Sequence, residues 1–246
     1  TIELLAKRLR IDMQEEIDTY LSFDSLLKEW HDSIILKLNA KATSIKTRLE
    51  GINLLKIPDF YQSYTLILTR YYLLIGESKI VKSLIEEMDC WRELSLYDQN
   101  MLDHIKGKFF LDYQGDFNLA ICYLKKINLT YYNKPEYYYD LAVAYMCMNS
   151  RILAYHYANK ALQFFTSANS FNRILETEML MLIQVEQEEI FDTKDSGYPR
   201  LIEMADNLGL IDQKAILLHN YAYQLFRNGY YEKAFENYSQ SLMLRD

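Results

Sequence analysis

The sequence has 246 residues and a formal net charge of −7, and half of its residues are apolar. A chain of this length and composition can bury a sizeable core, which excludes a disordered protein. The acidic balance argues against nucleic-acid binding by this chain itself, because phosphate contacts need a net basic surface or a dense basic stripe. Only 7 glycines and 3 prolines interrupt the chain, so long helices are favoured and the predicted class is all-α.

The first twenty residues do not follow the pattern of the rest. Their apolar residues share one helical face, and the chain turns near Asp12 into a new predicted helix. One interpretation is an ordinary amphipathic helix capped by Thr1. The pattern T-x-E-x-L-A-K-R-L-x-I-x also resembles the end of a lambda-repressor-like helix-turn-helix domain. That resemblance implies that residues 1–21 are the C-terminal remnant of a DNA-binding domain whose reading helices lie upstream.

Self-similarity dominates the remainder of the chain. Placing Gly115, Asn149 and Gly229 at one turn position brings the surrounding residues into register, with a period of about 34 residues, as in tetratricopeptide repeats. The predicted repeat units cover 62–92, 101–134, 135–168, a stretched unit at 171–208, and the chain from about 215 onward. A helix pair in 22–51 is expected to form a bridge, so the predicted domains are 1–21, 22–60 and 61–246.

This pattern predicts the fold. Each helical hairpin has an apolar face that it cannot bury alone, and stacking about five hairpins gives a right-handed α-solenoid with a concave binding face. The alternative is a generic helical bundle whose spacing is accidental. The near-consensus last unit, LHNYAYQLFRNGYYEKAFENYSQSL, favours repeats.

The order of these parts resembles the RRNPP family of Gram-positive peptide-pheromone receptors. The segments YYYDLAVAYMCMNSRILAYHYANKALQFF and NRILETEMLMLIQ carry the resemblance together with the helix-turn-helix remnant. It implies a dimeric quorum-sensing regulator that binds a short signalling peptide in its repeat domain and thereby changes its DNA binding. Such a change is a shift between two conformations, so the peptide must bind one of them more tightly.

The resemblance also implies which residues contact the peptide. In the family, asparagines on the inner helices clamp the peptide backbone, since a carboxamide both donates and accepts hydrogen bonds. Asn220 matches that position in HNYAYQL, whereas the earlier units carry Asp140 and Lys106 there, a departure from the family's ladder. The other residues expected on the inner helices are Phe109, Tyr113, Tyr139, Val143, Met146, Glu178, His219, Tyr223 and Arg227.

No pattern in the sequence indicates catalysis. The four histidines, His31, His104, His156 and His219, lie far apart and without metal-ligand spacing, so we expect surface or hydrogen-bonded core residues. Neither a GxSxG motif nor a phosphate-binding loop occurs. We therefore expect no catalytic residue, no metal and no cofactor.

The cysteines and the hydropathy bear on location. Cys90, Cys122 and Cys147 lie in apolar helical runs without metal-type spacing, which predicts reduced core residues. No charge-free run of about 18 apolar residues is present, and the first residues lack the apolar region of a signal peptide. We expect a cytoplasmic protein without a membrane span.

Two other functions remain open. The repeats could form a plain scaffold that binds a protein tail, with no DNA role. Alternatively, the chain could act like Rap-type proteins on a response-regulator partner, although 22–51 contains no glutamine of the kind that such relatives use.

Overall fold

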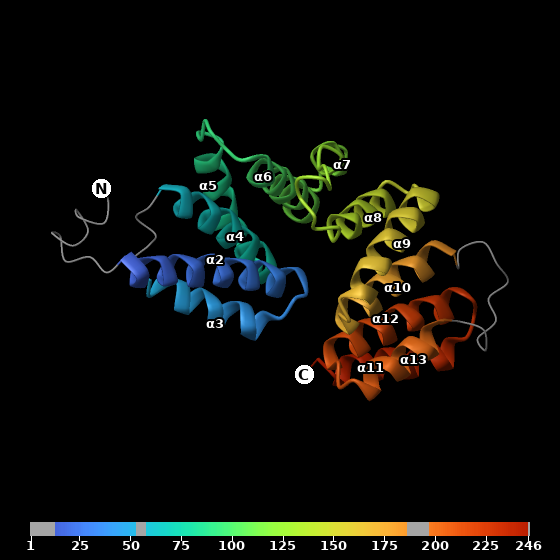
Figure 1. Cartoon of the computed structure of the whole chain (residues 1–246). Helices are drawn as coiled ribbons and strands as arrows, with labels where there is room; N and C mark the ends of the chain where they lie inside the picture. Colours follow the sequence, from blue (N-terminus) through green and yellow to red (C-terminus); the bar gives the residue numbers. More distant parts are fainter. Residues whose placement is uncertain (1–12, 53–57, 186–196, 246) are drawn as a thin grey trace. The chain divides into compact units, whose positions relative to one another are not determined.

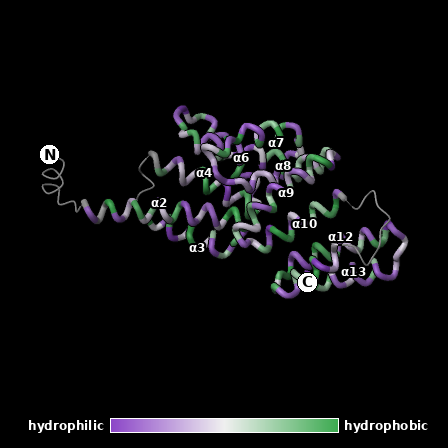
Figure 2. The backbone as a smooth tube through the Cα atoms, turned by 45° about the vertical axis from the view of Figure 1, so that its right-hand side comes forward, coloured by the Kyte–Doolittle hydropathy of each residue, from purple (hydrophilic) through white to green (hydrophobic). Residues whose placement is uncertain are grey.

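A computed structural model describes residues 13–52, 58–185 and 197–245. Helices account for nearly all regular structure in these ranges, and no strand occurs in them, so the predicted all-α class is confirmed (Figure 1). Hydrophilic and hydrophobic residues alternate along each helix (Figure 2), as expected when one face of every helix is buried. The chain divides into two compact units, which are described separately below.

The first unit contains residues up to 115 together with 126–132. Two helix pairs, α2–α3 and α4–α5, build it together with α6, which runs on into one π-helical turn, η2. The helices are α2 (Met13–Ile35), α3 (Asn39–Glu50), α4 (Pro58–Ile75), α5 (Ser78–Met88), α6 (Leu96–Phe109) and η2 (Phe110–Gln114).

The second unit contains residues 116–125 and 133 onward. Its helices are α7 (Phe117–Leu124), α8 (Tyr137–Cys147), α9 (Arg151–Ser167), α10 (Phe171–Val185), α11 (Gly197–Asn207), α12 (Ile211–Arg227) and α13 (Tyr231–Met243). Successive helices pack on one another, closely in α8–α9–α10 and in α11–α12–α13. The join between these two sets is the stretched hairpin, where α10 and α11 touch much less than other neighbours do.

The turn alignment predicted from the sequence is confirmed by the backbone. Gly115, Asn149 and Gly229 all adopt left-handed conformations, with φ of 65°, 56° and 83°, and Gly76 in the preceding unit has φ of 86°. In this conformation the chain ends one helix and reverses into the next. Five residues after each turn a small or β-branched side chain is buried against the first helix: Val81, Ala120, Ala154 and Ala234.

The predicted bridge has the same design as the repeats. Lys37, between α2 and α3, has φ of 54°, and Ala42, five residues later, is fully buried. The backbone N–H of Leu38 donates to the Ser33 carbonyl over 2.8 Å, as Tyr230 N–H donates to Leu225 in the last hairpin over 2.9 Å. The α2–α3 pair is therefore a repeat-type hairpin that the sequence pattern did not reveal, because its turn residue is a lysine rather than a glycine.

The helix-turn-helix remnant lies almost wholly outside the described residues, since 1–12 are not described. Its remaining residues belong to α2, which continues without a break past residue 21. The limits 1–21, 22–60 and 61–246 therefore stay predictions.

The expectation that the cysteines are core residues is wrong. Cys90, Cys122 and Cys147 are free and exposed. Cys147 is the last residue of α8, and Cys90 lies two residues after the end of α5. An apolar run in the sequence does not by itself place its last residues in the core.

None of the described helices combines the length and the apolar composition that a membrane span requires.

Candidate functional site

Helix α12 presents an unburied row of side chains that suits ligand binding. Its buried face carries Leu217, Leu218, Tyr221, Ala222 and Leu225. At about 100° per residue, five other residues fall within roughly 80° of one another on the outside of the helix. We call them the α12 stripe: Gln213, Ile216, Asn220, Tyr223 and Arg227, all half-buried or exposed.

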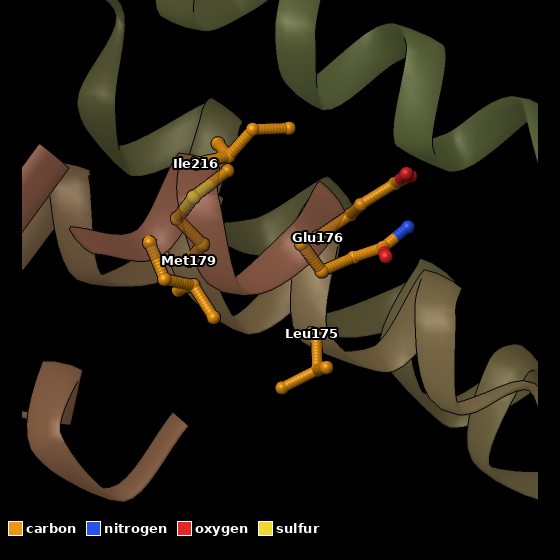
Figure 3. A pocket seen from close by; sticks show the side chains of 6 residues that line it. Leu175, Glu176, Met179 and Ile216 are labelled. Carbon is orange, nitrogen blue, oxygen red and sulfur yellow. The ribbon is translucent and has the colours of Figure 1, made fainter. Parts of the chain in front are cut away.

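A small apolar pocket lies beside the first half of this stripe. Leu175, Glu176 and Met179 of α10 line it together with Gln213, Ile216 and Leu217 of α12. Figure 3 shows Met179 and Ile216 close together, with Glu176 farther along α10. The pocket is a shallow depression with room for about one water molecule, so its apolar floor can pack against an apolar side chain of a ligand without enclosing it.

Asn220 lies next to this pocket, one helical turn beyond Ile216. Its Nδ2 donates to the Met179 Sδ atom over 3.0 Å. A thioether is a weak acceptor, and within the described ranges it is the only hydrogen-bond partner of this carboxamide. The half-buried amide can therefore exchange this bond for two good ones to a peptide group at little cost.

The far end of the stripe is aromatic and cationic. The Arg227 guanidinium carbon lies 6.0 Å from the centre of the Tyr223 ring, and both side chains are exposed. His219 is exposed too, but its ring packs edge-on against Tyr238 of α13 at 5.2 Å. Of the four residues predicted on α12, Asn220, Tyr223 and Arg227 thus belong to the stripe, and His219 faces α13.

The residues predicted on α8 divide between core and surface. Tyr139, Val143 and Met146 are half-buried and pack against the cluster of Ala142, Ala158 and Leu180. Asp140 is only 5% exposed, so its carboxylate is not available to a ligand. Asp140 and Asn220 hold equivalent positions in their repeats. The position is therefore buried in the α8–α9 repeat, whereas it is half-buried in the α12–α13 repeat.

Sequence reasoning missed Arg173, which connects α8, α9 and α10. Its guanidinium carbon lies 4.2 Å from the Tyr139 ring centre and 4.5 Å from that of Phe165. It also donates to Glu176 over 2.6 Å, with both side chains largely buried. Arg173 thereby fixes Tyr139 and the pocket residue Glu176 together. Only the i,i+3 spacing of Arg173 and Glu176 could have indicated it.

Glu178 is not part of the pocket. Its carboxylate accepts from the Arg200 guanidinium of α11 over 2.7 Å. Glu178 thus contributes to the contact between α10 and α11, which its position in the repeat did not reveal.

Three predicted residues lie in the first unit. Lys106 forms an ion pair with Asp89, and Phe109 is buried against Phe110 and Tyr113, with ring centres 5.9 and 5.8 Å apart. Burial raises the pKa of the Tyr113 phenol, which keeps it neutral. Lys106 thus pairs with the end of α5, and Phe109 and Tyr113 pack on each other where α6 continues into η2.

A buried polar network forms the centre of the first unit. Arg70 of α4 donates to His104 Nδ1 of α6 over 2.6 Å and to the Tyr132 hydroxyl over 2.7 Å. His31 of α2 lies 3.4 Å from the same hydroxyl through Nε2, and 3.2 Å from the Tyr97 hydroxyl through Nδ1.

The sequence predicted histidines that lie on the surface or are hydrogen-bonded in the core, and both kinds occur. His31 and His104 are buried and hydrogen-bonded, whereas His156 and His219 are exposed. Across the described ranges, no three His, Cys, Asp or Glu side chains gather as metal ligands would.

Comparison with known proteins identifies the fold. No protein-family profile and no curated protein match the sequence. The solved structure of NprR in complex with its cognate peptide NprX matches with a TM-score of 0.75 and 20% identity, over 91% of this chain and 68% of that one. A Rap protein complexed with Competence and Sporulation Factor matches with a TM-score of 0.76 and 18% identity, over 91% and 65%.

The apo form of the quorum sensor NprR from B. thuringiensis matches with a TM-score of 0.72 and 20% identity, over 95% of this chain and 66% of that one. The chain thus spans about two thirds of the length of these proteins. NprR and the Rap proteins are RRNPP-family receptors, so the resemblance noted in the sequence is confirmed at the level of the tetratricopeptide-type fold.

Proposed function

We propose that this chain is the ligand-binding part of a cytoplasmic, peptide-sensing regulator, and that a short linear peptide binds along the α12 stripe. The observation that carries the proposal is the Asn220 carboxamide. It is half-buried beside an apolar pocket and bonded only to a thioether within the described ranges. This arrangement offers a peptide one backbone clamp and one side-chain pocket.

The structural neighbours support this proposal. One is NprR with its cognate peptide bound, and another is a Rap protein with Competence and Sporulation Factor bound. In both, a protein of this fold is in complex with a ligand.

DNA regulation by a homodimer is the second part of the proposal. It rests on the helix-turn-helix pattern of residues 1–12 and on the acidic charge of the chain, which leaves DNA contacts to a domain upstream. Sedimentation of this chain should then show a two-subunit species whose population rises with concentration if the repeats make the dimer. A strict monomer would place the dimer contact elsewhere.

Calorimetric titration tests the peptide part. Synthetic peptides copied from the small open reading frame next to the gene are titrated into the folded chain, with scrambled peptides as the control. The expected result is saturable binding with a Kd of micromolar or below for one peptide and none for its scrambled form. Absence of binding across the set would favour a protein-binding scaffold or a Rap-like partner of a response regulator.

A further inference from the structure

Arg227 pairs with no carboxylate in the described ranges, and the same holds for Lys233 of the adjoining α13, which lies over the Tyr230 ring. Arg173 pairs with Glu176, Arg200 with Glu178, and Lys214 with Asp206. Among the described residues, the one ring or charged group that interacts with the Arg227 guanidinium is the Tyr223 ring. A ring at this position limits the motion of the guanidinium without using any of its five N–H donors. The chain has a net charge of −7, so an arginine left without an acidic partner is conspicuous.

The separation of Arg227 from the pocket along α12 determines how many peptide residues can lie between them. Ile216 and Arg227 are eleven positions apart on the same side of α12, with Asn220 between them. A rise of about 1.5 Å per residue puts them roughly 16 Å apart along the helix. An extended peptide advances about 3.3 Å per residue, so roughly five residues cover this distance.

We propose that Arg227 binds the C-terminal carboxylate of the peptide, and that the pocket of Leu175, Met179 and Ile216 takes an apolar side chain about five residues before that carboxylate. The inference rests on the proposed function, because it gives the peptide a direction along α12. A guanidinium matches a carboxylate with two parallel hydrogen bonds, so a free C-terminus is the ligand group that fits best. Asn220 then lies beside a peptide group between the two ends.

Affinity selection with two peptide libraries tests the inference. Randomised hexapeptides are prepared as free acids and, separately, as C-terminal amides, and the peptides retained by the chain are identified by mass spectrometry. We expect retained free acids with an apolar residue at the first or second position. Retention of nothing from either library contradicts the proposed function itself. Equal retention of acids and amides leaves peptide binding in place and overturns the role of Arg227.

A comparison of the wild type with two arginine variants distinguishes a specific contact of Arg227 with the carboxylate from a general effect of positive charge on peptide binding. For one retained peptide, the ratio of the amide Kd to the acid Kd is measured on the wild type, on Arg227→Gln and on Arg245→Gln. Arg245 is exposed after the end of α13 and serves as the matched control. An exposed ion pair that becomes partly buried predicts a ratio of about three to ten in the wild type and the control.

In Arg227→Gln the same ratio should fall to about one. Both arginines are exposed, so both variants should fold, and circular dichroism checks this. A ratio that stays unchanged in Arg227→Gln overturns the inference. So does a set of retained peptides whose binding depends on an Asp or Glu side chain instead of the terminus.

Discussion

The cores of the two compact units are built from different kinds of side chain. In the first, Arg70, His31, His104 and Tyr132 form a buried polar network. In the second, four fully buried alanines, Ala142, Ala154, Ala158 and Ala161, let α8 and α9 approach closely. The first unit therefore has a polar network at its centre, whereas the second combines a close helix approach at small side chains with one largely buried ion pair, Arg173–Glu176.

This difference bears on which unit offers side chains to a ligand. A buried polar network tolerates only the arrangement that satisfies all its members, which favours a unique and rigid packing. Helices held by small residues leave their larger polar side chains on the outside. Apart from Ile216, the α12 stripe is made of such residues, and we place the ligand there.

The largest expected effect is the loss of Arg70. Arg70→Met removes the donor to both His104 and Tyr132 while keeping much of the side-chain volume. Leaving two buried hydrogen-bonding groups without this donor should destabilise the first unit by about 2–5 kcal/mol. Hydrogen exchange resolved by peptide fragments measures it, because unfolding of two units need not be two-state.

The matched control for that variant is Arg200→Met, which removes an exposed arginine from its pair with Glu178. Its cost should be below about 1 kcal/mol. Equal effects of the two variants would mean that the network contributes nothing beyond a surface ion pair.

A smaller effect is expected from overfilling the second unit. Ala158 is fully buried between α8, α9 and α10, so Ala158→Leu must displace its neighbours and should cost about 1–3 kcal/mol. The next residue, Asn159, is exposed on the same helix, and Asn159→Leu supplies the control. Denaturant unfolding followed by hydrogen exchange in α8–α10 compares the two. A tolerated Ala158→Leu would show that the close helix approach is not needed.

Loss of the Asn220 clamp should weaken peptide binding and leave folding intact. Asn220→Ala removes two hydrogen bonds to the ligand in exchange for one weak bond to Met179, so binding should weaken by about 1–3 kcal/mol. Asn237→Ala, on α13, removes an amide that bonds only within its own helix. Titration with a bound peptide measures both variants, and an unchanged affinity in Asn220→Ala would remove this residue from the site.

Local signals in the sequence were sufficient for the repeats. Gly115, Asn149 and Gly229 mark turns because few residues adopt left-handed backbone, and that requirement can be read at a single position. Asn220 and Arg227 followed from the register of the last unit. The outward position of a helical side chain can be predicted from such a register.

Long-range pairing could not be predicted in the same way. Arg70 meets His104 across 34 positions and Tyr132 across 62, and nothing in the local pattern selects those partners. Asp140 illustrates the same limit, since its repeat position matches Asn220 while its surroundings bury it. The ion pair of Glu178 with Arg200 could not be predicted either, because the two residues are 22 positions apart and their contact leaves no periodic signal.

The smallest expected effect concerns the turn of the α2–α3 hairpin, which the sequence pattern predicted as a helix pair but not as a repeat. Lys37 holds a left-handed turn with φ of 54°, which costs a residue with a Cβ roughly 1 kcal/mol. Lys37→Gly should therefore stabilise the first unit by about 0.5–1 kcal/mol. The reverse change, Gly76→Lys, should destabilise it by a similar amount, because nothing lies within 4 Å of a Cβ at Gly76 and only the backbone is affected. Urea unfolding of both variants should give shifts of opposite sign; shifts of the same sign would mean that the α2–α3 turn is not equivalent to the turns of the other repeats.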